Sequence, residues 1–290
     1  MKKSKLKKFI PWWLRILFKI ILKRIPLLND YNFWQKYSLF RHGSMDNCEY
    51  SYNVFFNHRK KLNSKSLKGK LILEVGPGDG ISTALIAASF GASSILIDAD
   101  NFAKKDISYL VKLSNFLKKK GLNCPDVYIS DTLEEVLFKC NSRYLTKGLE
   151  SFYSLQENSV DLIFSQAVLE HVYKSDFFYL IREFYRICKL DGICSHQVDL
   201  RDHLGGGLNN LRFSEDLWES EFFKKSGFYT NRIQFEEMIE IFNKVGFSCH
   251  DIKINRWEKL PLSKNKMSSQ FKDLSINNLN IKSFDVILKK

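Results

Sequence analysis

Short runs of apolar residues, separated by longer amphipathic stretches, recur through most of this chain. The run at 71–75 is interrupted by a single acid, and comparable runs follow at 94–98, 127–131, 160–164 and 193–200. Apolar runs of this length, bounded by glycine or polar residues, are typical of strands buried in a parallel sheet. The small-residue stretch 81–90 predicts a helix between the first two runs. Strands that alternate with helices predict an α/β fold with a doubly wound sheet.

Further elements flank this alternating pattern. A helix over 51–66 is expected to lead into the first strand, and another helix is expected at 235–245. The aromatic-rich segment 204–231 interrupts the alternation after the fifth strand. We expect it to overlie the ligand crevice and shape the acceptor pocket, because binding loops are commonly carried on a rigid scaffold. The same segment could instead form a small satellite core. The pattern of residues 132–158 supports no assignment.

A glycine-rich turn follows the first predicted strand. Residues 74–80 read Glu-Val-Gly-Pro-Gly-Asp-Gly, so Gly76, Gly78 and Gly80 occupy alternate positions. Glycine permits a sharp turn and a close approach of backbone to ligand, and the next helix offers N–H groups at its first turn. The spacing differs from the G-x-G-x-x-G of dinucleotide-binding folds. The pattern therefore predicts a nucleotide-type cofactor site at the carboxyl end of the first strand.

Acidic residues end the second and third predicted strands. Asp98 comes 22 residues after Gly76. An acid at that place can accept hydrogen bonds from two ribose hydroxyls. Asp131 ends the third run, and residues 160–172 then read VDLIFSQAVLEHV.

In these four elements, over roughly residues 70–199, the chain resembles the class I S-adenosylmethionine (SAM) dependent methyltransferases. The resemblance implies a seven-stranded, mostly parallel Rossmann-like sheet, in which 247–256 and 283–288 form a terminal antiparallel pair. It also implies that SAM is the cofactor and that Asp131 holds the adenine amino group. The expected cofactor-binding residues are Glu74, Gly76, Pro77, Gly78, Gly80, Asp98, Asp131, Ser165 and Gln166.

Candidate catalytic residues follow the fourth and fifth strands, whose carboxyl ends meet at one edge of the sheet. Methyl transfer to oxygen or nitrogen requires alignment and removal of a proton, and histidine suits the second task because its ordinary pKa lies near neutrality. His203 is the first candidate base, His171 the second, and Asp202 an alternative. Some similar methyltransferases bind a divalent metal through a carboxylate, a Glu and a His after the fourth strand. Gln166 takes the place of that carboxylate here, so no metal ligands are assigned.

The basic excess of the chain belongs entirely to its first 68 residues. They hold 16 lysines and arginines against three acids, which equals the net charge of +13 of the whole chain. Residues 5–25 predict an amphipathic helix with tryptophans and aliphatic residues on one side and basic residues, Arg15, Lys19 and Lys23, on the other. These charges argue against a membrane-spanning helix, and no cleavage site indicates a signal peptide. An in-plane helix on an anionic membrane surface is expected, and a cap helix packed on the catalytic domain is the alternative.

We therefore divide the chain into a basic N-terminal extension, 1–68, and a methyltransferase domain, 69–290. Six scattered cysteines without a C-x-x-C pair favour a reducing cytoplasm. The expected function is methylation of oxygen or nitrogen on a small-molecule or lipid-linked acceptor at the inner face of a membrane, and similar chains suggest surface-polysaccharide or lipid-linked sugar modification. No DNA partner is expected, because the N/D-P-P-Y/W and Pro-Cys motifs of DNA methyltransferases do not follow the fourth strand. The alternatives are an RNA methyltransferase and a non-catalytic SAM-binding component of a membrane complex.

Overall fold

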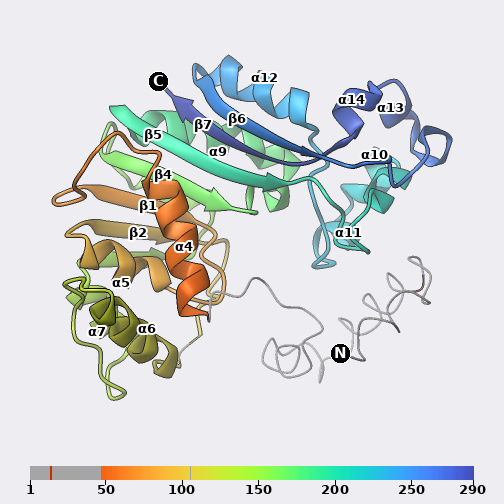
Figure 1. Ribbon diagram of the computed structural model, residues 1–290. Coiled ribbons are helices and arrows are strands. Elements are labelled where there is room, and N and C mark those ends of the chain that lie inside the picture. Colours follow the sequence, from red (N-terminus) through yellow and green to blue (C-terminus); the bar gives the residue numbers. More distant parts are fainter. Residues whose placement is uncertain (1–13, 15–46, 105) are drawn as a thin grey trace.

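A seven-stranded sheet with helices on both faces forms the centre of the computed structural model, which describes residues 14, 47–104 and 106–290 (Figure 1). The strand order is β3-β2-β1-β4-β5-β7-β6, with β1 to β5 parallel and β7 antiparallel to both of its neighbours. This confirms the predicted doubly wound, mostly parallel sheet and its terminal antiparallel pair. The strands are β1 Leu71–Val75, β2 Ser93–Ile97, β3 Ser142–Leu145, β4 Val160–Gln166, β5 Cys188–Asp199, β6 Ser248–Arg256 and β7 Ile281–Lys289.

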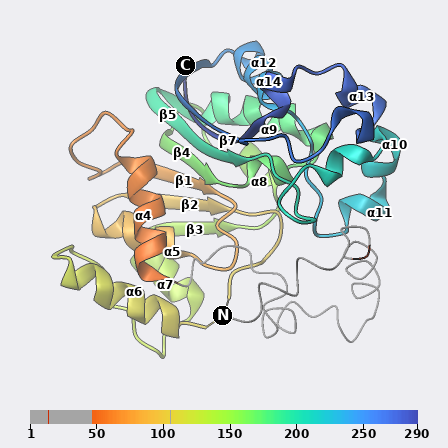
Figure 2. The same cartoon turned by 45° about the vertical axis from the view of Figure 1, so that its right-hand side comes forward.

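Two apolar cores lie on opposite faces of the sheet because successive strand residues point in opposite directions. In β1, Ile72 packs toward α4, α5, α6 and α7, whereas Leu73 packs toward α8, α9 and α12. Figure 2 shows these two helical layers from a second side. The helices of the layers are α4 Cys48–Arg59, α5 Ser82–Ser89, α6 Ser108–Lys119, α7 Leu133–Lys139, α8 Leu149–Tyr153, α9 Lys174–Ile187 and α12 Phe235–Val245. The predicted helices at 81–90 and 235–245 are thus confirmed within one residue at each end.

The third strand differs from the prediction. Residues 127–131 form an irregular segment in which the Tyr128 and Ile129 side chains are 59% and 72% exposed, so the predicted strand is wrong. The true third strand, β3, lies in the segment 132–158 that had no assignment. As an edge strand it is only half-buried and reads Ser-Arg-Tyr-Leu, so it lacks the continuous apolar run of a central strand. Its register with β2 is fixed in part by a 2.8 Å hydrogen bond between the hydroxyls of Ser94 and Ser142.

Two insertions build a small lobe beyond the carboxyl end of β5. The first follows β5 and contains α10 (Glu215–Trp218) and α11 (Glu221–Lys224), and the second separates β6 from β7 and contains α13 (Ser269–Lys272) and α14 (Ile276–Leu279). Figure 2 places α10, α11 and α13 together at this end of the molecule. The lobe has two apolar clusters of its own, one around Trp218 in the first insertion and one in which residues of both insertions meet.

Arg232 joins the two insertions. Its buried guanidinium lies 5.3 Å from the Trp218 ring and 5.1 Å from the Phe271 ring, and it forms an ion pair with Glu215. It also donates to the carbonyl oxygen of Phe213 at 2.7 Å. One side chain therefore ties both insertions together through charge and stacking.

The predicted amphipathic helix over 5–25 lies outside the described residues, Leu14 excepted. None of the helices in the described part of the chain combines the length and apolar character needed to cross a membrane.

Two histidines are buried against the sheet. His196 of β5 has no exposed surface, lies 2.7 Å from the Ser165 hydroxyl through Nδ1, and stacks on Phe184. Burial lowers its pKa to about 3. His58 of α4 is 2% exposed, and burial lowers its pKa to about 4. Both imidazoles are therefore neutral at physiological pH.

The buried imidazole of His196 makes stability depend on pH. The unfolded chain takes up a proton at this histidine below pH 6.5 or so, whereas the folded chain does not, so folding loses stability as the pH falls. We expect the free energy of unfolding of the wild type, minus that of His196→Phe, to fall between pH 6.5 and pH 5 by up to about 1.4 kcal/mol per pH unit. Urea unfolding of both proteins at several pH values measures this difference, and a difference that stays constant with pH would contradict the assignment.

Candidate active site

The glycine turn after β1 is forced by contact with the turn after β4. Gly76 has φ +71°, and a Cβ at this position would lie 2.6 Å from Cγ2 of Val168. The Gly76 amide donates to the carbonyl oxygen of Ile97, the last residue of β2, at 2.8 Å. The carboxyl ends of β1, β2 and β4 thus converge on one residue that has to be glycine. Pro77 is buried directly behind it.

The structure brings Gly78 and Asp98 together as the sequence suggested. Gly78 has φ +68°, its amide donates to Oδ2 of Asp98 at 2.9 Å, and no atom lies within 4 Å of the place a Cβ would occupy. Oδ1 of Asp98 accepts the amide of Ala99 at 2.9 Å. Burial raises the pKa of Asp98 to about 6, although these two amides oppose the shift. The turn therefore pairs an open backbone surface with a carboxylate at the end of the next strand.

Glu74 is buried beneath the same turn. It is 3% exposed, and burial raises the pKa of its carboxyl to about 8 although a hydrogen bond with Thr83 opposes the shift. Its second oxygen, Oε2, has no hydrogen-bond partner among the described residues. A buried oxygen without a partner is costly, so this one is suited to a polar group that a ligand supplies.

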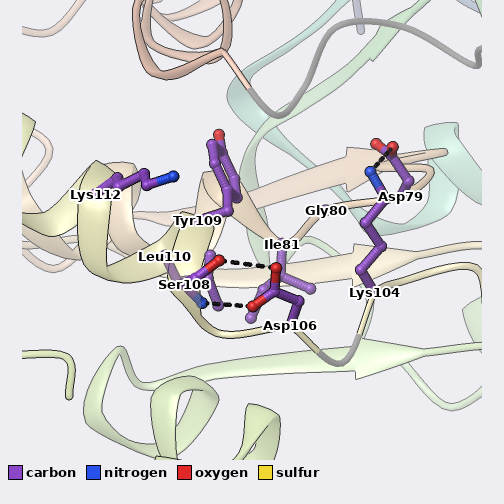
Figure 3. Close-up of a pocket in the computed structure, with 9 residues that line it drawn as sticks. All are labelled: Asp79, Gly80, Ile81, Lys104, Asp106, Ser108, Tyr109, Leu110 and Lys112. Atoms are coloured by element: carbon purple, nitrogen blue, oxygen red, sulfur yellow. Dashed lines mark hydrogen bonds and ion pairs between the residues drawn. The ribbon is translucent and has the colours of Figure 1, made fainter. Parts of the chain in front are cut away.

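A hollow of about 230 Å³ adjoins the glycine turn (Figure 3). Asp79, Gly80 and Ile81 form one wall, and the first turns of α6 form the other. Lys104 closes one end by an ion pair with Asp79 at 2.8 Å, while Lys112 points toward the hollow from α6. The hollow therefore shares Gly80 with the predicted cofactor loop and carries two lysines at its rim.

Asp131 does not join this group. It precedes α7, where its carboxylate pairs with Lys139 at 2.7 Å and accepts the amide of Tyr128 at 2.8 Å. Because residues 127–131 are not a strand, its predicted place at a strand end next to Asp98 is wrong. The residues that do follow β3, Thr146 to Gly148, include no acid, and Gly148 donates its amide to the carbonyl oxygen of Asp98 at 2.8 Å.

Ser165 and Gln166 end β4 with different surroundings. The Ser165 side chain is fully buried, and its hydroxyl is occupied by His196. Gln166 is half-buried, and its amide lies between Nε2 of His58 at 3.1 Å and Oε1 of Gln197 at 3.1 Å. His58 was not among the predicted site residues. Its place on the buried side of α4 with Val54 and Phe55 is the sequence signal that could have identified it.

The two candidate bases lie side by side. The rings of His171 and His203 have centroids 4.7 Å apart, although 31 residues separate them in the chain. Nδ1 of His171 lies 3.1 Å from the carbonyl oxygen of Tyr229. A carbonyl only accepts, so Nδ1 carries the hydrogen and Nε2 carries the lone pair in the neutral ring. Nε2 of His171 is therefore the basic nitrogen of this side chain.

Asp202, the third candidate, shapes its loop. Its carboxylate accepts the amides of Leu204 at 2.9 Å, of Gly206 at 3.0 Å and of Asn209. It is 3% exposed. This arrangement fixes the glycine-rich loop that carries His203, which gives Asp202 a positioning role.

Glu170, which precedes His171, has a buried carboxyl group. It is 2% exposed, and burial raises the pKa of its carboxyl to about 8, with nearby backbone amides opposing the shift. Asn231 holds the turn Leu169–His171 in place, because its amide donates to the carbonyl oxygen of Glu170 at 2.8 Å and its side chain donates to that of Leu169 at 2.8 Å. In the described part of the chain, no three His, Cys, Asp or Glu side chains gather as a metal site.

A family model for a methyltransferase domain matches residues 73–195. No curated protein shows significant sequence similarity to the chain.

Among solved structures, the chain is similar to phosphoethanolamine N-methyltransferase 2 of Haemonchus contortus in complex with SAM, with 17% identity, a TM-score of 0.45, and coverage of 82% of this chain and 52% of that one. It is similar to a SAM-dependent methyltransferase from Archaeoglobus fulgidus, with 17% identity, a TM-score of 0.46, and coverage of 90% and 100%. Geranyl diphosphate C-methyltransferase from Streptomyces coelicolor A3(2) gives 12% identity, a TM-score of 0.46, and coverage of 83% and 78%. The chain spans about half the length of the Haemonchus enzyme that it matches.

Residues 73–195 thus match a methyltransferase domain, and they lie in a sheet with the strand order expected of the class I SAM-dependent type. SAM is the cofactor expected of such a domain, and the residues present fit it. The open side of Gly78 leaves room for a ligand against the backbone, and Asp98 supplies a carboxylate beside it. Oε2 of Glu74 lacks a hydrogen-bond partner among the described residues, and a cofactor can provide one.

The open side of Gly78 predicts a binding defect that is separable from a folding defect. In Gly78→Ala the added methyl group occupies the space of the ligand, so we expect SAM affinity to fall about tenfold or more, with a stability cost of about 1 kcal/mol from the positive φ. Gly69→Ala is the matched control, because Gly69 has φ +71°, also has nothing within 4 Å, and lies at the amino end of β1. Calorimetric titration with SAM compares the three proteins, and equal affinities would remove the glycine turn from the cofactor site.

Proposed function

We propose that this protein transfers the methyl group of SAM to an oxygen or nitrogen of a small or membrane-associated acceptor, and that the His171–His203 pair accepts the acceptor's proton. The observation that supports this most strongly is the meeting of the two imidazoles at the carboxyl edge of the sheet, where the glycine turn also lies. The two histidines and the glycine turn follow different strands of the sheet. Ligand sites of α/β sheets are built in this way, at the carboxyl ends of the strands.

SAM, when bound, supplies an electrophilic methyl group on a positively charged sulfur, which leaves as a neutral thioether. The residues of this chain then have two tasks, to hold the acceptor atom in line with the methyl group and to take its proton. As the acceptor atom takes the methyl group, its proton would pass to Nε2 of His171 or to His203. The carbonyl of Tyr229 stabilises a positively charged His171 through the Nδ1 hydrogen bond.

The lobe built by the two insertions supports this arrangement. Asn231 and Tyr229 hold the turn that carries His171, and the Asp202-centred loop holds His203. The two rings therefore approach each other through separate supports. The aromatic cluster around Trp218 includes Leu204, which follows His203, and Tyr229, whose carbonyl accepts from His171. We infer that this lobe forms the acceptor side of the site and excludes water from it.

Substitution of His171 and of His203, one at a time, tests which of the two rings acts as the base and which only lies beside it. Removal of a general base typically costs about 10²- to 10⁴-fold in rate. We expect His171→Ala or His203→Ala to slow the single-turnover rate by that amount with SAM affinity unchanged, because neither ring lies in the glycine turn. Asp202→Asn serves as the control for loop positioning. It weakens the hydrogen bonds that the Asp202 carboxylate accepts from the loop amides, but it leaves both histidine rings in place. If neither histidine variant slows methyl transfer tenfold, proton removal belongs to another group or to the acceptor itself.

The acceptor is proposed to be lipid-linked, as in modification of a surface polysaccharide or of a lipid-linked sugar at the inner face of a membrane. The support is the charge distribution, because the net charge of +13 lies within the first 68 residues while the rest of the chain is balanced. Each basic residue near an anionic surface contributes about 1 kcal/mol to binding, and interfacial tryptophans add an apolar contribution.

Membrane binding by the full chain tests this proposal. We expect it to sediment with vesicles that contain phosphatidylglycerol and to remain largely unbound with neutral phosphatidylcholine vesicles. Substitution of Arg15, Lys19 and Lys23 by glutamine should weaken binding to the anionic vesicles, and high salt should weaken it without abolishing it. Replacement of three lysines outside this segment, Lys118, Lys119 and Lys120, is the charge-matched control.

Two outcomes would contradict the membrane proposal. One is the absence of binding to either vesicle type, which would favour a cap helix on the catalytic domain. The other is salt-sensitive binding to RNA that exceeds the binding to anionic vesicles, which would favour the RNA methyltransferase alternative.

A further inference from the structure

A chain of polar side chains connects α4 to the carboxyl ends of β4 and β5. Nδ1 of His58 lies 2.7 Å from the Ser195 hydroxyl, and its Nε2 lies 3.1 Å from Oε1 of Gln166. The Gln166 amide nitrogen donates to Oε1 of Gln197 at 3.1 Å, and the Gln197 amide nitrogen faces the carbonyl oxygen of Val198 at 3.4 Å. Four side chains from three elements thus form one continuous series.

The direction of every hydrogen bond in this series is fixed at one end. The Val198 carbonyl can only accept, so the amide nitrogen of Gln197 points to it and the amide oxygen of Gln197 points to Gln166. That oxygen requires the nitrogen of Gln166, which turns the oxygen of Gln166 toward His58. His58 therefore carries its hydrogen on Nε2, and Nδ1 accepts the hydroxyl of Ser195.

Burial stabilises this tautomer of His58 over the other one. His58 is 2% exposed and stacks on Phe164 with ring centroids 4.9 Å apart, and a neutral ring in a closed site keeps its hydrogen where its partner accepts. Gln166, by contrast, is half-buried, and the pairing of Val75 with Ser165 places it beside Gly76 at the cofactor turn. Among the described residues, one hydrogen of its amide nitrogen is used by Gln197 and the other has no partner, so it is left for a ligand.

We propose that His58 is a positioning residue that fixes the Gln166 amide with its nitrogen toward the cofactor crevice, where it donates a hydrogen bond to a carboxylate or hydroxyl oxygen of SAM. The inference rests on the proposed position of the cofactor at the glycine turn. Gln197 orients the same amide from β5, but its own bond to the Val198 carbonyl is long, at 3.4 Å. Without His58, both amides could therefore rotate together, and Gln166 would present its oxygen, which would repel an oxygen of the ligand.

Two substitutions at His58 separate positioning from packing. A glutamine places its amide nitrogen where Nε2 was and retains the donor to Gln166, whereas an asparagine reaches only the position of Nδ1 and retains the contact with Ser195. We expect His58→Gln to bind SAM within about twofold of the wild type and His58→Asn to bind it about five- to tenfold more weakly, the usual effect of one hydrogen bond. His58→Phe, which keeps only the stacking on Phe164, should match the asparagine variant.

His196→Phe is the matched control. His196 is equally buried, belongs to the opposite face of the sheet and bonds to Ser165, so its loss should lower the melting temperature while SAM affinity stays at the wild-type value. Isothermal titration with SAM and thermal unfolding are measured on all five full-length proteins. Equal affinities for the asparagine and glutamine variants overturn the proposal, whether both match the wild type or both are weakened. Wild-type protein that fails to bind SAM overturns the cofactor site itself, which is a distinct result.

The tautomer of His58 gives a test that needs no variant to fold well. Long-range ¹H–¹⁵N spectra of the wild type, with the His58 signals assigned by their loss in His58→Gln, show whether Nδ1 or Nε2 carries the hydrogen. Protonation at Nε2 is expected from the direction fixed at Val198. Protonation at Nδ1 would mean that the Gln166 amide points the other way and would overturn the proposal.

Discussion

The absence of a side chain at Gly76 is the constraint on which the rest of the site depends. Val168 fills the space that a Cβ would need, so the turn after β4 and the turn after β1 can touch only because residue 76 is glycine. The amide of the same residue holds the end of β2. Once these three strand ends meet, Asp98 reaches the amide of Gly78 and the turn Leu169–His171 reaches the edge of the sheet. A left-handed backbone conformation that glycine adopts without strain thereby organises both the cofactor side and the acceptor side.

Much of this arrangement could be predicted because central parallel strands carry a strong signal. The strands β1, β2, β4 and β5 are buried on both faces and read as apolar runs, so their glycine turn and their terminal residues could be placed at one edge. The edge strand β3 could not be found in the same way, because Ser-Arg-Tyr-Leu is half-exposed and its pairing is set by contacts with β2. The more apolar Val127–Ile129 drew the prediction away from it, and Asp131 was misplaced as a result.

The hydrogen-bond networks of side chains could not be predicted from the sequence, for a different reason. The proximity of His171 and His203 followed from the rule that ligands bind beyond strand ends, which places residues from separate loops in one crevice. The bonds of Asp202 to three nearby amides depend on the conformation of an irregular loop. Those of His58 to Ser195 and Gln166 depend on distances between segments more than 100 residues apart in the chain. No local pattern specifies such distances. The sequence could indicate only that His58 belongs to the buried side of its helix.

The tie at Arg232 has a consequence for how this domain can be varied. Its guanidinium is shared between two insertions that are separated in the chain by a helix and a strand, and its charge is balanced by Glu215 in the first of them. If one insertion were replaced by that of another enzyme, the buried guanidinium of Arg232 would lose either its ion pair with Glu215 or its contact with the Phe271 ring. An unpaired buried charge would destabilise a lobe of this size. The two insertions therefore form a single exchangeable unit, and any graft that aims to alter acceptor choice has to carry both of them together with the arginine between.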